Sequence, residues 1–264
     1  TNLYDGSTVN GYDRKGVRAR VDVTPSKALK ISLIADHVKS DDTTPSGVPV
    51  SNSVRSYPTL AVTNNPLFAA ALGALVPGPE NRQINSEMKT RVADTNEGLS
   101  AQVDYTMGSV QLTSITAHRK WKNTQFQELD RLSTVYRQFP QQADRGDLDF
   151  TQTSQELRIA STQKQFLEYV AGLFWFEGKN DERYQRDVTR CNGTTDTALP
   201  SGLIPCSAGS LTVDNGVANY GVRNTSKALF GEGTLNFSPR LRAIAGLRYT
   251  QDDLSYYHGR VASA

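Results

Sequence analysis

The residues best suited to chemistry in this chain are arginines that recur in the polar segment 178–225. They are Arg183, Arg186 and Arg190. Three carboxylates lie among them: Asp181, Glu182 and Asp187. A planar guanidinium binds carboxylates and phosphates through paired hydrogen bonds, so the segment favours anion binding. Because the signs nearly balance, a solvated loop held by its own ion pairs is the open alternative.

Aromatic side chains accompany the arginines in the long polar segments. An aromatic ring offers a large apolar surface, and tyrosine adds a polar tip, which suits ligand contact. We therefore predict a ligand-binding surface made by seven residues: Tyr57, Phe68, Tyr136, Tyr184, Arg183, Arg186 and Arg190.

The sequence offers little for catalysis. The three histidines, His37, His118 and His258, stand far from one another and from cysteine, without metal-ligand spacing. No serine stands in a nucleophile elbow. The triplet 231–233 lacks the third glycine of a phosphate-binding loop. We expect no enzyme activity, no metal and no cofactor.

The two cysteines, Cys191 and Cys206, lie in the same polar segment and are separated by small and polar residues. This spacing predicts a disulfide, and hence an oxidising compartment. Closing such a loop stabilises by about 3 kcal/mol in the unfolded-state entropy model. Two unpaired loop thiols are the alternative.

Composition narrows the class of protein. The chain has 264 residues, 37% of them hydrophobic, and a mean hydropathy of −0.49. No run approaches the ~20 apolar residues of a membrane-spanning helix. The net charge of +2 gives no global field for nucleic acid, so none is expected as a partner.

Stretches with a two-residue hydrophobic period dominate the chain and predict β-strands. They cover residues 14–24, 29–38, 99–106, 110–122, 151–160, 166–177, 226–237 and 241–250. In the first stretch, Val17 and Val21 share one face while Arg18 and Asp22 share the other. In 110–122 the apolar phase slips, which predicts a bulge near Ser114.

The connections between these stretches alternate in length. Short turns are predicted at Pro25-Ser26, Met107-Gly108, Gln163-Lys164 and Ser238-Pro239. Long polar segments separate the resulting hairpins: 39–98, 123–150 and 178–225. Compact soluble domains rarely carry such connections, whereas outer-membrane barrels have short turns on one rim and long loops on the other. The pattern predicts an all-β, antiparallel, up-and-down transmembrane β-barrel segment of about eight strands. One helix is expected after Asn65-Pro66, ending before Pro77.

Several strings resemble one family. They are GVRARVDVTPSKALKISLIADH (16–37), GSVQLTSITAHRKW (108–121), SQELRIAS (154–161), LEYVAGLFWFEG (167–178) and SKALFGEGTLNFSPRLRAIAGLRYTQDD (226–253). Taken in order, they resemble the β-barrel of TonB-dependent outer-membrane receptors, of the kind found in sphingomonads. The resemblance spans nearly the whole chain.

The resemblance implies a function and partners. Barrels of this family are large, with about 22 strands and a plugged lumen. We therefore expect residues 1–264 to be a partial barrel, without the plug domain, from a protein of the bacterial outer membrane. The implied partners are outer-membrane lipid, a TonB-type coupling protein acting through the plug, and a scarce ligand. That ligand would be an iron chelate of the siderophore type, cobalamin or a saccharide.

Two other interpretations stay open on the residues alone. One is a complete eight-stranded barrel with a structural or adhesive role. The other is a secreted β-sandwich that binds ligands or hydrolyses them. The first requires the end strands to pair, and the second requires two packed sheets.

Overall fold

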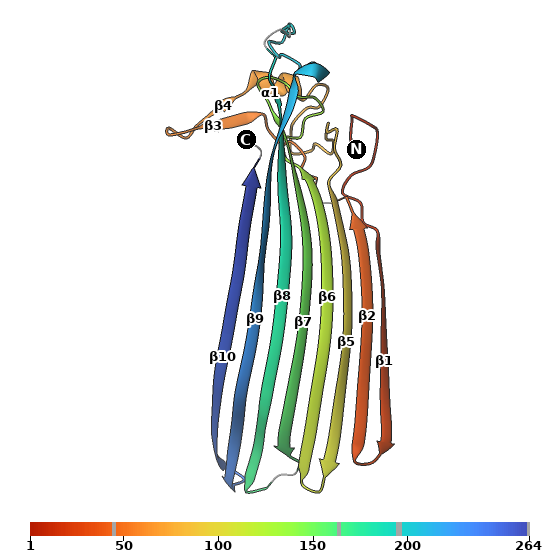
Figure 1. Cartoon of the computed structure of the whole chain (residues 1–264), viewed down its shortest axis with the longest axis vertical. Helices are drawn as coiled ribbons and strands as arrows, with labels where there is room; N and C mark the ends of the chain where they lie inside the picture. Colours follow the sequence, from red (N-terminus) through yellow and green to blue (C-terminus); the bar gives the residue numbers. More distant parts are fainter. Residues whose placement is uncertain (44–45, 163–164, 194–196, 263–264) are drawn as a thin grey trace.

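The structure is a computed structural model that describes residues 1–43, 46–162, 165–193 and 197–262. Its main feature is one antiparallel sheet of eight strands in the order β1-β2-β5-β6-β7-β8-β9-β10 (Figure 1). The strands are β1 (Arg14–Ser26), β2 (Leu29–Asp42), β5 (Arg91–Met107), β6 (Val110–Glu128), β7 (Gln141–Ser161), β8 (Leu167–Cys191), β9 (Leu211–Ser238) and β10 (Leu241–Ala262). Each strand pairs with its sequence neighbour, as the all-β, up-and-down prediction requires.

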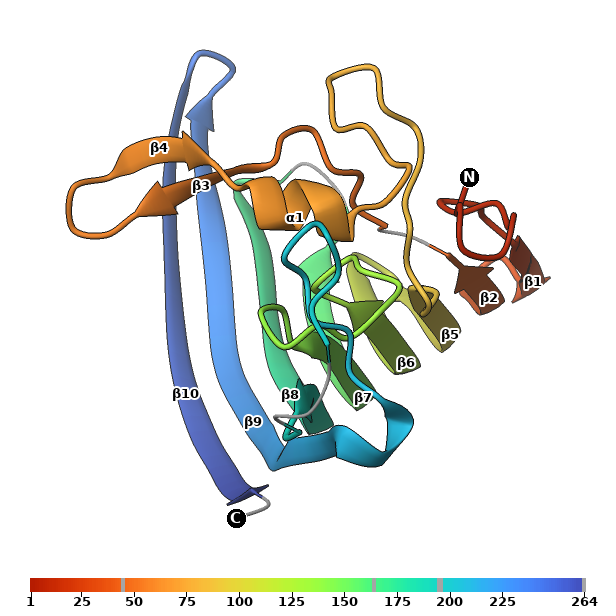
Figure 2. The same cartoon turned by 90° about the horizontal axis from the view of Figure 1, so that it is seen from above.

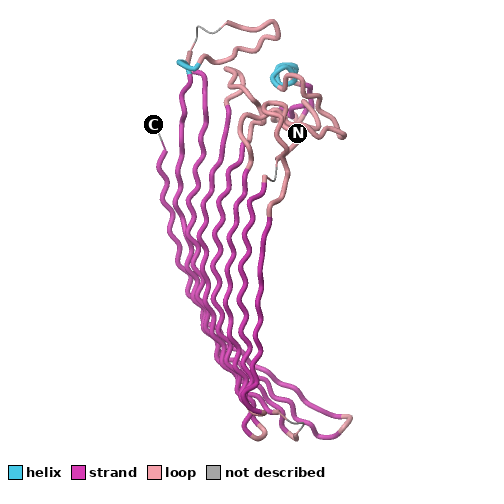
Figure 3. Tube along the Cα trace, turned by 90° about the vertical axis from the view of Figure 1, so that its right-hand side faces the viewer, coloured by secondary structure: helices cyan, strands magenta, loops and turns pink. Residues whose placement is uncertain are grey.

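The short turns that the structure describes lie at one end of the sheet and the long connections at the other (Figures 1 and 3). The turns fall one or two residues later than predicted, at 27–28, 108–109 and 239–240. At the first turn, the register shifts between Val23 and Ser26, because Pro25 cannot donate to the ladder. The predicted turn at Gln163-Lys164 lies outside the described residues.

The strands are much longer than predicted, and the long connections are correspondingly shorter. β8 has 25 residues and β9 has 28, so most of the predicted loop 178–225 is strand. The connections are 43–90, 129–140 and 192–210. These strand extensions show no hydrophobic alternation in the sequence, because both of their faces are polar. Ion pairs between neighbouring strands, such as Lys122–Asp149 and Arg223–Glu177, lie along the extensions in place of apolar side chains.

The two faces of the sheet differ in character along its lower part. Exposed apolar side chains share one face, here called the outward face; examples are Val17, Leu33, Leu99 and Leu247. The register carries the same face through all eight strands. The predicted bulge near Ser114 is wrong, since β6 pairs with both neighbours without any register shift. The outward face of β6 is simply polar in its middle, and Ile115 lies on the other face.

The strand register also gives the angle between the strands and the normal to the apolar band. On β1 the outward apolar residues run from Val17 to Val23, centred at Arg20; on β10 they run from Leu241 to Tyr249, centred at Ala245. Pairing carries Arg20 across the sheet to Asp252. The band therefore drifts by about seven residues over seven strand steps, which at ~3.3 Å rise and ~4.8 Å spacing is a tilt of about 35°.

Both the tilt and the height of the band fit a membrane barrel. Transmembrane barrels tilt their strands by about 35–45°. The segment Leu241–Tyr249, about nine residues, covers roughly 22–24 Å along the barrel axis at that tilt, close to the ~25 Å apolar band of outer-membrane barrels. The strand extensions thus rise beyond the band at the end with the long connections.

The opposite face, here called the inner face, is polar and crowded. Buried polar side chains gather there, including Ser32, Ser40, Asp42 and Asn123. Asp94 accepts hydrogen bonds from Trp121 Nε1 at 2.7 Å and from Asn123 Nδ2 at 2.8 Å. Such side chains are satisfied by one another along a wet lumen wall rather than by an apolar core.

The long connections fold together into a small cap on the concave side of the curved sheet (Figure 2). The cap contains the hairpin β3 (Ser53–Ser56) and β4 (Ala61–Asn64), the helix α1 (Pro66–Ala71) and a single 3-10 turn η1 (Ala208–Ser210). The predicted helix is confirmed: Asn65 caps it by accepting from Phe68 N at 3.1 Å, and Pro66 fills its first turn.

The two alternative folds are not what the strands form. Within the described residues β1 and β10 are the edges of the large sheet and do not pair, so the eight strands do not close on themselves. A second large sheet, as a sandwich requires, is not found there either; the other sheet is the β3-β4 hairpin. Among the described residues, no helix is long and apolar enough to cross a bilayer.

Glycine at Gly172 tests the packing of the inner face. A Cβ there would lie 2.5 Å from Phe230 Cζ and 2.7 Å from the Leu157 carbonyl oxygen, so Gly172→Ala forces the ring and the backbone apart. We expect a loss of about 1–3 kcal/mol in unfolding free energy, measured by chemical denaturation of the protein in detergent.

The matched control is Gly146→Ala on β7, where an added Cβ meets no atom within 4 Å. If both substitutions lower the unfolding free energy equally, the loss comes from strand propensity and not from the contact with Phe230.

Candidate functional site

The candidate site is a groove on the inner face, where β8, β9 and β10 extend above the apolar band. Its volume is about 440 Å³. The lining residues are Tyr184, Arg186, Val188, Asp214, Asn215, Gly216, Ala218, His258, Arg260 and Ala262. Gly216 and Ala218 are the small residues between β8 and β10, pairing with Arg186 and Tyr184 on one side. Small side chains on the middle strand leave room for a ligand between the larger ones on its neighbours.

Arg186 is fixed on one wall of the groove. Its Nε and Nη2 atoms each donate to an oxygen of Asp144 at 2.7 Å, which is the forked geometry that guanidinium favours. The guanidinium also lies 5.9 Å from the Tyr184 ring centroid. Burial of Asp144 opposes its ionisation, but the hydrogen bonds from Arg186 and Tyr184, together with the charge of Arg186, outweigh burial and lower its pKa.

The opposite wall, on β10, carries His258 and the guanidinium of Arg260, and the His258 ring lies beside Tyr220 of β9. Tyr220 and His258 lie with ring centroids 6.2 Å apart and planes tilted by 30°. A hydrogen bond with Glu182 raises the pKa of Tyr220 to about 12, so this phenol stays neutral. Arg260 projects over Gly216, and among the described residues no carboxylate lies within ion-pair distance of it.

These groups can hold a flat or anionic chemical group. The guanidinium of Arg260 offers unused donors, while Tyr184 and His258 offer ring faces. Arg190 is occupied, since its Nε lies 3.2 Å from Asp214. Chemistry that breaks bonds is not suggested by this arrangement. Within the described ranges, no cluster of three or more His, Cys, Asp or Glu has metal-binding spacing.

The structure separates the predicted ligand residues into four places. Tyr184, Arg186 and Arg190 lie together on the inner face of β8, in the strand extension rather than in a loop. Arg183 lies on the outward face, where it donates to Gln185 at 2.7 Å. Tyr57 is at the turn of the β3-β4 hairpin and is 91% exposed.

The other two predicted residues belong to the core of the cap. The core consists of the buried residues Ala71, Leu72, Leu75, Leu132 and Leu203. Phe68 and Tyr136 pack against it, and Phe68 meets Phe139 edge-on at 5.8 Å between centroids. Their placement gives both side chains a structural role, whatever contact their exposed edges make with a ligand.

Sequence reasoning missed Asp144, His258 and Arg260. The predicted strand 241–250 ended before His258, and a lone histidine carried no metal signal. The usable signal is the alternation itself: continuing the two-residue period past 250 places His258 and Arg260 on the same face as Arg248.

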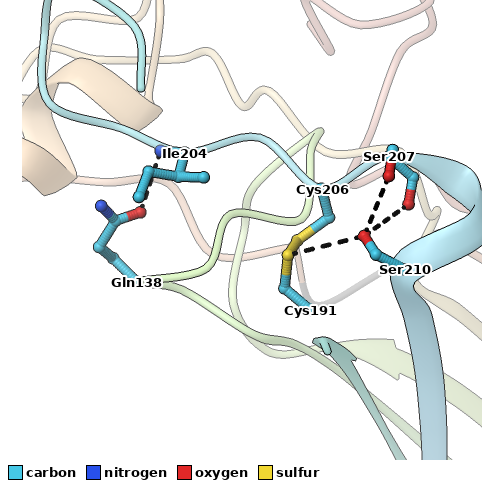
Figure 4. Close-up of a disulfide and its surroundings, with 6 residues drawn as sticks. All are labelled: Gln138, Cys191, Ile204, Cys206, Ser207 and Ser210. Atoms are coloured by element: carbon cyan, nitrogen blue, oxygen red, sulfur yellow. Dashed lines mark hydrogen bonds between the residues drawn. A yellow bond between two sulfur atoms is a disulfide. The ribbon is translucent and has the colours of Figure 1, made fainter. Parts of the chain in front are cut away.

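The predicted disulfide is present and closes the loop at the top of β8 and β9 (Figure 4). Cys191 and Cys206 have a Cα–Cα separation of 5.5 Å. Beside it, Gln138 reaches from the neighbouring loop to accept from Ile204 N at 3.2 Å and to donate to the Gly202 carbonyl at 2.9 Å. These hydrogen bonds fasten segments 129–140 and 192–210 to each other, and the disulfide ties segment 192–210 to the end of β8.

Three carboxyl groups, those of Glu87, Glu128 and Asp130, are partly buried at the base of the cap. Leu132 N donates to both Glu128 and Asp130, and Gln142 N donates to Asp130 at 2.6 Å. Burial, with the neighbouring Asp130, raises the pKa of Glu128 to about 8; burial also raises those of Asp130 and Glu87. The cap therefore holds protons that an unfolded chain would release.

Comparison with known proteins agrees with this geometry. The family model described as TonB dependent receptor-like, β-barrel, matches residues 35–263, and the chain belongs to this family. Among solved structures, the ferric yersiniabactin uptake receptor FyuA from Yersinia pestis matches with a TM-score of 0.50 and 10% sequence identity. The match covers 98% of this chain and 37% of that one, so this chain spans little more than a third of its length. A search of curated proteins finds no match.

The carboxyl cluster makes the cap sensitive to pH. A pKa raised in the folded state means that the cap binds more protons than the unfolded chain. Stability of the cap is therefore full below the ordinary value near 4.5, and falls as the pH rises toward about 8. Glu128→Gln removes the charge and keeps an acceptor oxygen, so we expect a flatter profile and a more stable cap above pH 7.

Hydrogen–deuterium exchange of peptides containing Leu72 and Leu132, between pH 5 and 8 and corrected for intrinsic exchange, measures this. Glu80→Gln is the control, since the Glu80 side chain is 93% exposed in the same cap. Protection that falls equally with pH in wild type and Glu128→Gln would contradict the assignment.

Proposed function

We propose that this chain is part of the barrel wall of a bacterial outer-membrane receptor that binds a scarce small ligand and imports it. The observation that carries the proposal is the sorting of the two faces along one tilted sheet. The outward face has an apolar band of bilayer height, and the inner face is mainly polar, with its charged side chains paired across strands. Membership of the TonB dependent receptor-like barrel family supports the same conclusion.

The long connections would face the cell exterior, as they do in outer-membrane barrels. Lipid would surround the apolar band. Import would need energy from a TonB-type coupling protein, acting through a plug domain. This chain would supply part of the wall along which the ligand enters, together with a cap that covers the approach.

The ligand would be a metal chelate of the siderophore type, cobalamin or a saccharide. The inner-face groove supports this range, because it combines ring faces, polar groups and one free guanidinium. A related fold is found in a receptor whose reported cargo is ferric yersiniabactin, an iron chelate. No bond in the ligand need be made or broken by this chain.

Receptor-dependent uptake tests the proposal. Cells lacking the gene for the whole receptor are complemented with wild type, and accumulation of radiolabelled ferric siderophores, cobalamin and oligosaccharides is measured with and without a protonophore. We expect one class to accumulate only with the receptor and only in energised cells. If no class does so, or if uptake survives de-energisation, the import function is rejected.

The groove itself is tested by Arg260→Ala in the same cells. Losing a charge-assisted hydrogen bond costs about 1.5–3 kcal/mol, so the Kd of the imported ligand should rise about 10–100-fold. Arg183→Ala, on the outward face of β8, is the matched control and should bind normally. An unchanged Kd for Arg260→Ala would remove the groove from the binding site and leave import to be judged on uptake alone.

A further inference from the structure

We propose that the Cys191–Cys206 disulfide acts as a redox-sensitive strap, which holds the cap over the inner-face groove until an external thiol reduces it. Two features carry the inference: the disulfide lies where the wall meets the cap, and a short backbone ladder joins it to the neighbouring loop. The inference rests on the proposed function only in treating the groove as the place where a ligand binds.

The disulfide divides the connection between β8 and β9 into two unequal parts. Cys191 is the last residue of β8 and pairs with Leu211, the first residue of β9. The Cα atoms of Cys191 and Cys206 are 5.5 Å apart, so Cys206 is held at the rim of the wall. Residues 207–210 are the short link from there to β9, whereas residues 192–205 lie within a covalently closed ring.

A short antiparallel ladder joins this fixed point to the loop between β6 and β7. Cys206 N donates to the Val135 carbonyl at 3.1 Å, and Arg137 N donates to the Ile204 carbonyl at 2.9 Å. An antiparallel bridge lies between these two bonds. The two segments therefore lie side by side next to the disulfide (Figure 4), and reduction leaves the ladder without its anchor on the wall.

The ladder holds together the two loops whose leucines meet in the cap core. Leu132 of one loop is 1% exposed and Leu203 of the other is 2% exposed, and both pack with Leu72 at the end of α1. A core of so few side chains supplies little stability by itself, and small folds of this kind depend on covalent links such as disulfides. Once the disulfide is reduced, the segment that carries Leu203 loses the constraint that keeps it in the core.

The same junction borders the groove. Val188 of β8 and Asp214 of β9 both line the groove. Each lies three residues from the Cys191–Leu211 pair, which is about 10 Å along a strand. The disulfide therefore stands between the groove below and the cap above, and the position of Cys206 sets how closely the cap sits over the groove.

Reduction by an external thiol proceeds in two exchange steps. The thiolate of one thiol attacks a sulfur of the disulfide, which forms a mixed disulfide and releases the other cysteine as a thiolate that takes a proton. A second thiol attacks the external sulfur, which frees the second cysteine. Two external thiols and the protein disulfide thus become one external disulfide and two cysteine thiols. The turn beside the sulfurs, Ser207 to Gly209, is exposed, so a small thiol can reach them.

Hydrogen–deuterium exchange of the protein in detergent, with and without dithiothreitol, tests the strap. We expect reduction to speed exchange at least about tenfold in peptides containing Leu132 and Leu72, which lie outside the disulfide-closed ring. Closing a ring of this length shifts an opening equilibrium by on the order of a hundredfold in the unfolded-state entropy model. Peptides of the wall below the groove should exchange as before.

Two outcomes of this experiment overturn the proposal. Faster exchange confined to residues 192–210 would make the disulfide a local staple, and equally faster exchange along β8 and β9 would show that it holds the wall and not the cap. The control is the variant with both Cys191→Ser and Cys206→Ser, which has no disulfide and should exchange like reduced wild type whether or not dithiothreitol is present. If that variant still responds to dithiothreitol, the reductant acts elsewhere and the strap is rejected.

A reporter thiol in the groove measures access directly. Ala218 lines the groove, and Val217 beside it faces outward on the same strand. Ala218→Cys and Val217→Cys are each made with the native disulfide and with the two serine substitutions, and the rate of labelling by a maleimide is measured. We expect loss of the disulfide to speed labelling at residue 218 at least about fivefold, with residue 217 unchanged. No acceleration at residue 218, or the same acceleration at residue 217, overturns the proposal.

Reversal distinguishes a switch from a purely structural bond. After dithiothreitol is removed, oxidised glutathione should re-form the disulfide and return exchange of the Leu132 peptide to its original rate. If the disulfide re-forms and the cap stays open, reduction damages the cap instead of regulating it, and the proposal fails. Uptake in cells is judged separately: a wild-type protein that imports no ligand rejects the import function, whereas exchange and labelling use no ligand and still decide the strap.

Discussion

The unbroken antiparallel ladder is the constraint on which the rest of this structure depends. A wall that crosses lipid must satisfy every backbone donor and acceptor between strands, because no water is present to replace them. From β2 to β9, pairing therefore runs without bulges through the apolar band. Once the ladder is continuous, alternation commits each residue to one face, and the drift of about one residue per strand sets the tilt.

Because each side chain is fixed on one face of the sheet, the inner face is built from side chains that bind one another. Charged side chains on it cannot turn toward lipid, so they pair across strands, and glycines on intervening strands let long side chains cross. Arg119 reaches over Gly98 to Asp36 at 2.8 Å, and an added Cβ at Gly98 would meet both side chains. Above the band, Tyr257 crosses Gly221 to Asp181 in the same way on the outward face. Such crossing pairs tie neighbouring strands of the wall together, whereas Arg260 has no carboxylate within ion-pair distance among the described residues.

The sequence predicts a strand wherever apolar and polar residues alternate, and it misses the strand extensions in which they do not. Within the band, Val17 to Val23 and Leu241 to Tyr249 mark strands, because one face meets lipid and the other meets water. Beyond the band, residues such as Lys179 to Arg190 are polar on both faces, and a two-sided polar strand has the composition of a loop. The groove residues lie on these extensions. Tyr184 and Arg186 were predicted from their residue types alone, whereas His258 and Arg260 could be placed only from the strand register. The bulge predicted near Ser114 was wrong because Ile115 was assigned to the outward face. It lies on the inner face, since a lumen wall tolerates apolar residues there.

The cap and the wall obtain stability from different sources, and this difference bears on how a ligand could pass. Among the residues that the structure describes, the largest fully buried apolar side chains are Leu72, Leu132 and Leu203, all in the cap and none in the wall. The cap is held by that small core, one disulfide and a few loop-to-loop hydrogen bonds, while each wall strand is held along its whole length. Opening the cap therefore disrupts few interactions compared with separating any two strands. Under the proposed import function, movement is expected in the described parts of the cap, with the groove on β8–β10 staying fixed beneath them.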